Sequence, residues 1–128
     1  MMNAQSNNIN WFEIPADNIE RAKTFYETIF EIEMAQQEMN GMKLAFFPYE
    51  MGSGKAAGAL AQSEQHKPSM DGSILYLNGG SDLSNVLNRI EGAGGKVLMP
   101  KTQINEEIGY MAFFLDTEGN RLALHSPN

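Results

Sequence analysis

The sequence contains one pattern of predicted strands and helices twice, and this duplication constrains the fold more than any other feature. In the first copy, apolar side chains recur at spacings of three and four residues from Ile19 to Phe30, which predicts a helix with one buried face. In the second copy a similar stripe runs from Leu83 to Ile90, and the glycines that follow are typical of a helix end. The starts of the two helices are 64 residues apart (83 − 19 = 64). A repeat of this length indicates a duplicated half-domain, because solenoids use shorter units in greater number.

In each copy, one predicted strand precedes the helix and three follow it. Asn40-Gly41 is a favourable two-residue hairpin turn in the first copy, and Pro100 is expected to end a strand in the second. The repeated order βαβββ predicts an α+β fold, in which two tandem βαβββ modules form curled mixed sheets around a cavity. The predicted strands are Ile9–Ile14, Glu31–Gln37, Met42–Pro48, Ala56–Gln62, Ser73–Asn78, Lys96–Met99, Tyr110–Leu115 and Arg121–Ser126.

The composition between the two patterns sets the expected boundaries. Residues 63–72 are polar, contain a proline and a glycine and have no periodicity, so they are predicted to link the modules at 9–64 and 72–127. Residues 1–8 are polar, and we expect them to form a flexible arm ahead of a single domain at 9–127.

The composition also excludes several classes of function. The 128 residues contain no cysteine, which excludes disulfides, thiolate nucleophiles and zinc–cysteine sites. A formal net charge of −7 argues against a nucleic-acid partner. No apolar run approaches the roughly 20 residues that a membrane span needs. We therefore expect a cytoplasmic protein with no membrane or nucleic-acid partner.

Three segments resemble motifs of a known superfamily. The run from Ile14 to Ala22 (IPADNIERA), followed by Phe25-Tyr26, is similar to the opening of the vicinal oxygen chelate superfamily, which includes glyoxalases, bleomycin-resistance proteins and extradiol dioxygenases. The run from Phe114 to Leu122 (FLDTEGNRL) resembles its closing hairpin, and Gly94-Gly95-Lys96-Val97 also fits. The resemblance extends over about Ile9 to Pro127 and implies the doubled βαβββ fold.

The resemblance also implies a chemistry, in which a divalent metal holds two oxygens of a substrate. In that superfamily the metal ligands come from the first and last strands of each half. Transferred to this sequence, the four positions fall on Trp11, Gly58, Leu75 and Ala123. None of these residues can bind a metal. We therefore expect no cofactor, with a divalent metal at a different set of positions as the open alternative.

Two other residues on the same strands can carry chemistry. Because side chains alternate faces along a strand, Glu13 shares a face with Trp11, and His125 shares one with Ala123. If these faces line the cavity, Glu13 and His125 form a candidate pair for acid–base catalysis. The alternatives are a strand-end carboxylate that meets solvent and an exposed residue near the C-terminus. The other histidine, His66, lies in the predicted linker.

Aromatic residues supply candidate walls for a ligand. Trp11 and Tyr110 are predicted to line the cavity and to bind an apolar or cationic molecule, with core packing as the alternative for Trp11. Tyr76 and Asn78 are expected on the helix side of their sheet. The loop from Tyr49 to Lys55 contains two glycines and is interpreted as a hinge or lid.

Three functions remain open at this point. The leading hypothesis is a protein that binds a small organic molecule between its modules without a metal, with catalysis unproven. The second is a divergent lyase or isomerase of the lactoylglutathione-lyase type, and the third is a drug-sequestering protein like the bleomycin-resistance members. A homodimer is expected from the family resemblance.

Overall fold

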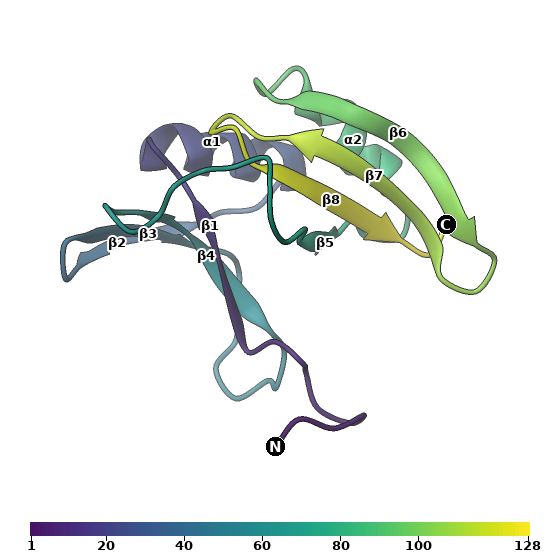
Figure 1. The fold of residues 1–128 in the computed structure, drawn as a ribbon, viewed down its shortest axis with the longest axis horizontal. Helices are drawn as coiled ribbons and strands as arrows, with labels where there is room; N and C mark the ends of the chain where they lie inside the picture. Colours follow the sequence, from purple (N-terminus) through teal and green to yellow (C-terminus); the bar gives the residue numbers. More distant parts are fainter.

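The computed structural model describes residues 1–128 and contains two four-stranded mixed sheets and two helices (Figure 1). The predicted α+β class with two tandem βαβββ modules is confirmed. The first module consists of β1 (Trp11–Pro15), α1 (Ile19–Phe30), β2 (Ala35–Met39), β3 (Met42–Phe46) and β4 (Ala57–Gln62). The second consists of β5 (Tyr76–Asn78), α2 (Ser84–Ile90), β6 (Lys96–Asn105), β7 (Gly109–Leu115) and β8 (Arg121–Ser126).

Both sheets have the same topology. The strand order is β1-β4-β3-β2 in the first sheet and β5-β8-β7-β6 in the second. In each sheet the first strand pairs in parallel with the last, and the other neighbours are antiparallel. The predicted hairpin turn is present, with Asn40 and Gly41 both at positive φ (50° and 76°). Neither helix is long and apolar enough to cross a membrane.

A side chain from the last strand of each module fixes the start of that module's helix. In the first module, the backbone N–H of Ile19 donates to Oε1 of Gln62 at 2.8 Å. In the second, the backbone N–H of Leu83 donates to Oγ of Ser126 at 2.9 Å. Gln62 and Ser126 are also 64 residues apart (126 − 62 = 64), so the repeat extends to individual hydrogen bonds.

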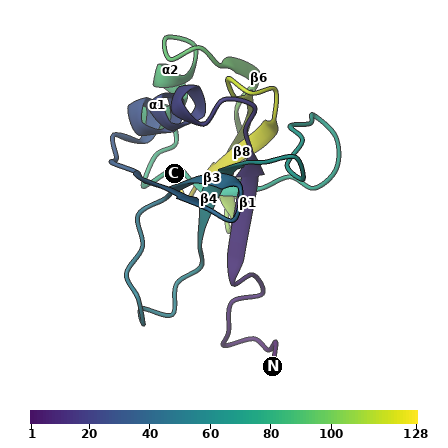
Figure 2. The same ribbon diagram turned by 90° about the vertical axis from the view of Figure 1, so that its left-hand side faces the viewer.

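The two modules share one hydrophobic core. It contains the apolar faces of α1 and α2, which contact each other, together with the helix-side face of each sheet (Figures 1 and 2). Phe25 and Tyr26 of α1 are 1% and 0% exposed, and the ring of Phe25 lies 6.2 Å from that of Phe114 in β7. The opposite face of each sheet therefore points away from this core.

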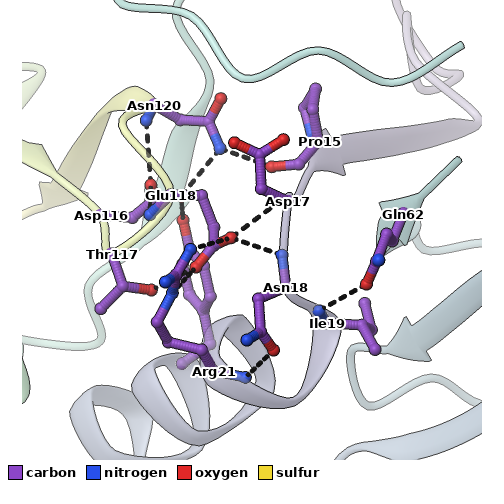
Figure 3. Close-up of polar contacts among 11 residues, drawn as sticks. Pro15, Asp17, Asn18, Ile19, Arg21, Gln62, Asp116, Thr117, Glu118 and Asn120 are labelled. Carbon is purple, nitrogen blue, oxygen red and sulfur yellow. Dashed lines mark hydrogen bonds and ion pairs between the residues drawn. The ribbon is translucent and has the colours of Figure 1, made fainter. Parts of the chain in front are cut away.

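A turn of the second module, Asp116–Asn120, holds the start of α1 in the first (Figure 3). Oε1 of Glu118 accepts hydrogen bonds from the backbone N–H groups of Asp17 and Asn18 at 2.9 and 2.8 Å. Arg21 donates to the same carboxylate from Nε at 2.7 Å and from Nη2 at 3.0 Å. Burial alone would raise the pKa of Glu118, but the hydrogen bonds from Arg21 and the backbone outweigh it and lower the pKa. We call this segment the Glu118 turn.

The Glu118 turn is itself held by Asp116. The carboxylate of Asp116 accepts hydrogen bonds from the hydroxyl of Tyr26 at 2.8 Å and from the backbone N–H groups of Glu118 and Asn120. Burial raises the pKa of both Asp116 and Tyr26. The Asn120 amide donates to the backbone oxygen of Pro15 at 2.6 Å. This contact ties the turn to the end of β1.

Several strand boundaries differ from those predicted, and two of these differences have a clear physical cause. β6 was expected to stop at Met99, but it continues through Pro100 because it is an edge strand, where a residue without an N–H is tolerated. The pairing of β6 with β7 shifts register between Met99 and Thr102, next to the proline. β2 begins at Ala35 and not at Glu31, because Glu31 adopts a left-handed conformation that ends α1.

Candidate functional site

The face of the first sheet that points away from the helices is fixed by the strand register. Trp11 pairs with Ala57, Glu13 pairs with Ala59, and Ala59 also pairs with Phe46. Because alternate residues share a face, these side chains stand together on the side opposite the core. We call this surface the first open face. It consists of Trp11, Glu13, Met42, Leu44, Phe46, Ala57, Ala59 and Ala61.

The first open face has a floor of small residues beside a row of aromatic rings. Ala59 and Ala61 are 0% exposed, covered by their larger neighbours. The ring of Phe46 lies 6.0 Å from that of Trp11 and 6.2 Å from that of Tyr49. Trp11 keeps 43% of its surface exposed, so a flat apolar group can contact it.

Glu13 lies on this face between two hydrogen-bond partners. Nε1 of Trp11 donates to Oε2 of Glu13 at 3.3 Å, and Nε2 of His66 lies 2.7 Å from Oε1. Nδ1 of His66 lies 2.6 Å from Oγ of Ser63. The side chains of His66 and Glu13 are 15% and 34% exposed, so the pair is reachable from solvent without being freely hydrated.

The contacts of Ser63 indicate how hydrogen bonds can run through the cluster of Ser63, His66 and Glu13. Its oxygen already accepts a hydrogen bond from the backbone N–H of Gln65 at 3.0 Å. Its hydroxyl can therefore donate to Nδ1 of a neutral His66, whose Nε2–H then donates to Glu13. When His66 is charged, both ring nitrogens donate and both neighbours accept. The cluster fits either protonation state, as a group that takes and returns a proton requires.

Sequence reasoning left His66 out of the site because residues 63–72 have no periodicity. The available signal was topological. β1 and β4 run in parallel, with Pro15 opposite Ala61, so residues just after β4 leave the sheet beside the end of β1. A histidine at that point can reach back to Glu13, as His66 does.

The corresponding face of the second sheet, the second open face, carries the predicted residue His125. It pairs with Met111, and Ala123 pairs with Phe113. Nε2 of His125 lies 2.7 Å from the backbone oxygen of Ile108, a neighbour in its own module. Within one chain the structure therefore brings Glu13 together with His66, and it leaves His125 on the other sheet. The second open face consists of Tyr76, Asn78, Met111, Phe113, Ala123 and His125.

The orientation of two tyrosines differs from that expected. Tyr76 pairs with Ala123 and stands on the second open face, with 50% of its surface exposed and its ring 6.2 Å from that of Phe113. Tyr110 stands on the helix side, where it packs against the core and where Nζ of Lys101 lies 4.7 Å from its ring centre. The expectation that Tyr76 and Asn78 face the helices was wrong, because Leu77 between them takes the core position.

Two of the four positions expected for metal ligands, Gly58 and Leu75, face the core and not an open face. Gly58 pairs with Phe12 on the core side, and Leu75 packs against the core. The open-face residues next to them are Ala59, which carries no ligand atom, and Tyr76. No three His, Cys, Asp or Glu side chains lie close enough together to hold a metal ion. The side chains of one chain therefore do not fit a divalent metal site.

A hollow of about 470 Å³ lies beside β1 and contains Trp11 and Glu13 among its lining residues. Lys67 and Asp71 of the inter-module segment and Arg121 of β8 also line it. Glu13 thus borders this hollow between the modules as well as the first open face.

Comparisons with known proteins agree on the fold. Residues 8–124 match the family model of the Glyoxalase/Bleomycin resistance protein/Dioxygenase superfamily. No curated protein matches the chain in sequence.

Solved structures of this type are similar to the chain at low sequence identity. Glyoxalase I from Zea mays has a TM-score of 0.70 at 17% identity, over 92% of this chain and 45% of that one. An antibiotic-binding protein from a Streptomyces species, TnmS3, has a TM-score of 0.66 at 23% identity, over 98% of this chain and 100% of that one. A family enzyme from Burkholderia phytofirmans has a TM-score of 0.66 at 13% identity, over 95% and 100%. The chain spans less than half of the maize enzyme, and these identities establish a common fold alone.

Proposed function

Because the chain belongs to the glyoxalase/bleomycin resistance protein/dioxygenase superfamily, we propose that it binds a small organic molecule on its first open face without a metal. The observation that carries this proposal is Glu13, a carboxylate held by Trp11 and His66 at the end of an aromatic row. A second copy of the chain completes the site with its second open face.

The residues of the first open face favour a ligand with an apolar body and a positive charge. Aromatic faces attract cations through their quadrupoles, and the rings of Trp11 and Phe46 stand next to the Glu13 carboxylate. A flat body can stack on the exposed ring of Trp11, because Ala59 and Ala61 are fully covered by neighbouring side chains. This chemistry supports the drug-sequestering hypothesis, and the antibiotic-binding protein of the same fold agrees with it.

The exposed side chains of both open faces support the second copy. Trp11 and Tyr76 are 43% and 50% exposed, although large aromatic residues are usually buried more deeply. Neighbouring exposed apolar residues mark surfaces that bind a partner. In a symmetric dimer, the first open face of one chain meets the second open face of its partner twice, which encloses two equivalent sites.

The only tryptophan of the chain is Trp11, so its fluorescence reports directly on this site. Benzyltrimethylammonium is a suitable probe, and we expect it to change the emission of Trp11 in a saturable manner. Removing the charge with Glu13→Gln should weaken binding by about tenfold, the effect of roughly 1.4 kcal/mol. Benzyl alcohol, a neutral aromatic probe, should bind both proteins equally.

The matched control is Glu107→Gln, which removes one negative charge from an exposed loop far from β1 in the sequence. It should bind the cationic probe like the parent protein. An equal loss in both variants would show that net charge alone attracts the probe, and it would contradict the proposed site.

The hydrogen bonds of His66 keep an enzyme as the second candidate. A carboxylate and an imidazole 2.7 Å apart can remove a proton next to a carbonyl and return it to the neighbouring carbon, which is the work of a lyase or an isomerase. Deuterium incorporation into small hydroxyketones in deuterated water, lost in both Glu13→Gln and His66→Asn, would establish this activity. Binding of benzyltrimethylammonium without any such exchange would favour the sequestering protein.

A further inference from the structure

A hollow of about 720 Å³ lies between the modules beside both helices, and Trp11, Glu13 and His66 do not line it. Its volume is in the range of pockets that hold small organic ligands. Its walls are mostly apolar. The first module contributes Phe12, Phe30, Ile32 and Phe47, and the second contributes Leu77 and Val86.

The charges around this hollow differ from those of the rest of the protein. The chain has a net charge of −7, yet the only charged residue that lines the hollow is Arg89. Nε of Arg89 donates to the backbone oxygen of Ile29 at 2.9 Å, which fixes the guanidinium at the rim. Nη2 lies 3.6 Å from a carboxylate oxygen of Glu31, whose side chain is 75% exposed. This contact is long and the Glu31 side chain is exposed, so the guanidinium keeps donors for another anion.

The internal repeat identifies what occupies the equivalent space in the other half. In the first module, Asp17 and Arg21 bind the carboxylate of Glu118. The 64-residue offset relates these two residues to Ser81 (17 + 64) and Asn85 (21 + 64), and both line the hollow. The hollow is therefore the counterpart of a space that a carboxylate fills in the first module.

The segment that would fill the hollow by the same relationship stays outside it. The Glu118 turn corresponds to residues 52–56 (116 − 64 and 120 − 64), of which only Ala56 lines the hollow. Gly52 and Gly54 have no atom within 4 Å of the position of a Cβ, and the backbone oxygen of Gly54 accepts a hydrogen bond from Asn7 of the N-terminal segment, not from a residue of the hollow. The hollow therefore has no side chain of the protein in the position that the Glu118 carboxylate occupies in the other half.

We propose that this hollow is a second binding site, which Trp11, Glu13 and His66 do not line although it borders Ala57 of the first open face and Tyr76 and Asn78 of the second, and that it takes an apolar organic anion. The aromatic and aliphatic walls bind the body of the molecule, and Arg89 binds its carboxylate or sulfonate. The preference for an anion is the opposite of that proposed for the site of Glu13. The two sites therefore bind different classes of molecule.

The experiment uses two related probes with the full chain. 1-Anilinonaphthalene-8-sulfonate is an aromatic anion that fluoresces in apolar sites, and N-phenyl-1-naphthylamine is its neutral analogue. Asn85→Phe places a ring in the hollow from an exposed position of α2 and should weaken sulfonate binding at least tenfold. The control is Asn88→Phe, an exposed position of the same helix outside the hollow, which should leave binding unchanged.

Variants of the charged residues test the role of Arg89. Arg89→Gln should weaken binding of the sulfonate about tenfold and leave the neutral probe within about twofold. Arg89→Lys keeps the positive charge but lacks the Nε donor to Ile29, and it should retain most of the affinity. This variant therefore distinguishes the effect of the charge from the effect of the hydrogen bond to Ile29. Glu31→Gln removes the competing carboxylate and should strengthen sulfonate binding, a gain that misfolding cannot produce.

Two results would overturn the proposal. One is equal sulfonate binding by Asn85→Phe and Asn88→Phe, or a signal that Trp11→Ala removes and Asn85→Phe does not, since the probe would then occupy the first open face. The other is an equal effect of Arg89→Gln on both probes, because an anion site must distinguish the sulfonate from its neutral analogue.

Discussion

Arg21 of the first module and Glu118 of the second form a two-pronged ion pair, with Nε 2.7 Å from Oε2 and Nη2 3.0 Å from Oε1. The Glu118 side chain is 0% exposed, whereas that of Arg21 is 51% exposed. The carboxylate also accepts two backbone N–H groups just before α1. One buried group therefore fixes how the second module sits against the helix and the first strand of the first.

The substitution Glu118→Gln tests this junction. It keeps the size of the side chain but removes the charge and turns an amide toward the Arg21 donors. We expect the free energy of unfolding to fall by roughly 2–4 kcal/mol, because a buried polar group loses its partners. Urea unfolding measures the change. Glu107→Gln, on an exposed loop, should stay within about 0.5 kcal/mol of the parent protein.

The contribution of Glu118 should also depend on pH. The native contacts lower its pKa below the ordinary value of 4.5. A lowered carboxyl pKa stabilises the folded state above the unfolded pKa, and this stabilisation is lost as the pH falls through the folded pKa. From pH 6 to 7, the difference in unfolding free energy between the parent and Glu118→Gln should stay constant to within about 0.5 kcal/mol. Below pH 4.5 this difference should shrink. A difference that grows in acid would contradict the assignment.

Tyr26→Phe probes the buried support of the Glu118 turn. The hydroxyl of Tyr26 is inaccessible and donates to Asp116 at 2.8 Å. Its loss should cost about 1.5–3 kcal/mol, the range for a hydrogen bond to a charged group, and the cost stays in this range because Asp116 keeps its other donors. Tyr49→Phe is the control, since Tyr49 is 59% exposed. A change below about 0.5 kcal/mol in Tyr26→Phe would mean that the bond adds no net stability.

Gly58 is required by packing and does not mark a lost metal ligand. A Cβ at this position would lie 2.4 Å from the backbone oxygen of Phe12 and 2.6 Å from its ring. Gly58→Ala should therefore destabilise the protein by roughly 2–4 kcal/mol in thermal or urea unfolding. Gly92→Ala is the matched control, because its nearest neighbour is 3.9 Å away, and it should be neutral or slightly stabilising. Full stability of Gly58→Ala would show that β1 and β4 can move apart.

The sequence was sufficient to predict the order of elements, because each helix has a clear apolar stripe and each module repeats it. It was not sufficient to predict which residues of a short strand face the core. β5 has only three residues, so one step of register exchanges Leu77 with Tyr76. His66 and Glu118 could not be assigned either, since both act through contacts between segments about 50 and 100 residues apart. Contacts between such distant segments produce no periodic pattern in the local sequence.

The proposed dimer predicts a defined response to charge on the open faces. Trp11→Lys and Tyr76→Glu each place a charge where an apolar face of the partner would bury it, which should disrupt association. Each variant alone should be a monomer of 14.2 kDa by light scattering, whereas the parent protein and the surface control Asn88→Lys should have twice this mass. A monomeric parent protein at micromolar concentration would contradict the dimer.

Mixing the two variants distinguishes among the ways in which the faces can pair. If the first open face of each chain meets the second open face of the other, a heterodimer of Trp11→Lys with Tyr76→Glu has one unaltered interface and one in which lysine faces glutamate. Dimers should therefore reappear in the mixture at low salt and weaken as salt is added. If the first open faces met each other, the lysine would face an unaltered Trp11 and mixing would restore nothing. Recovery in the mixture thus requires that Trp11 of one chain lies across from Tyr76 of the other, on the two sides of a shared site.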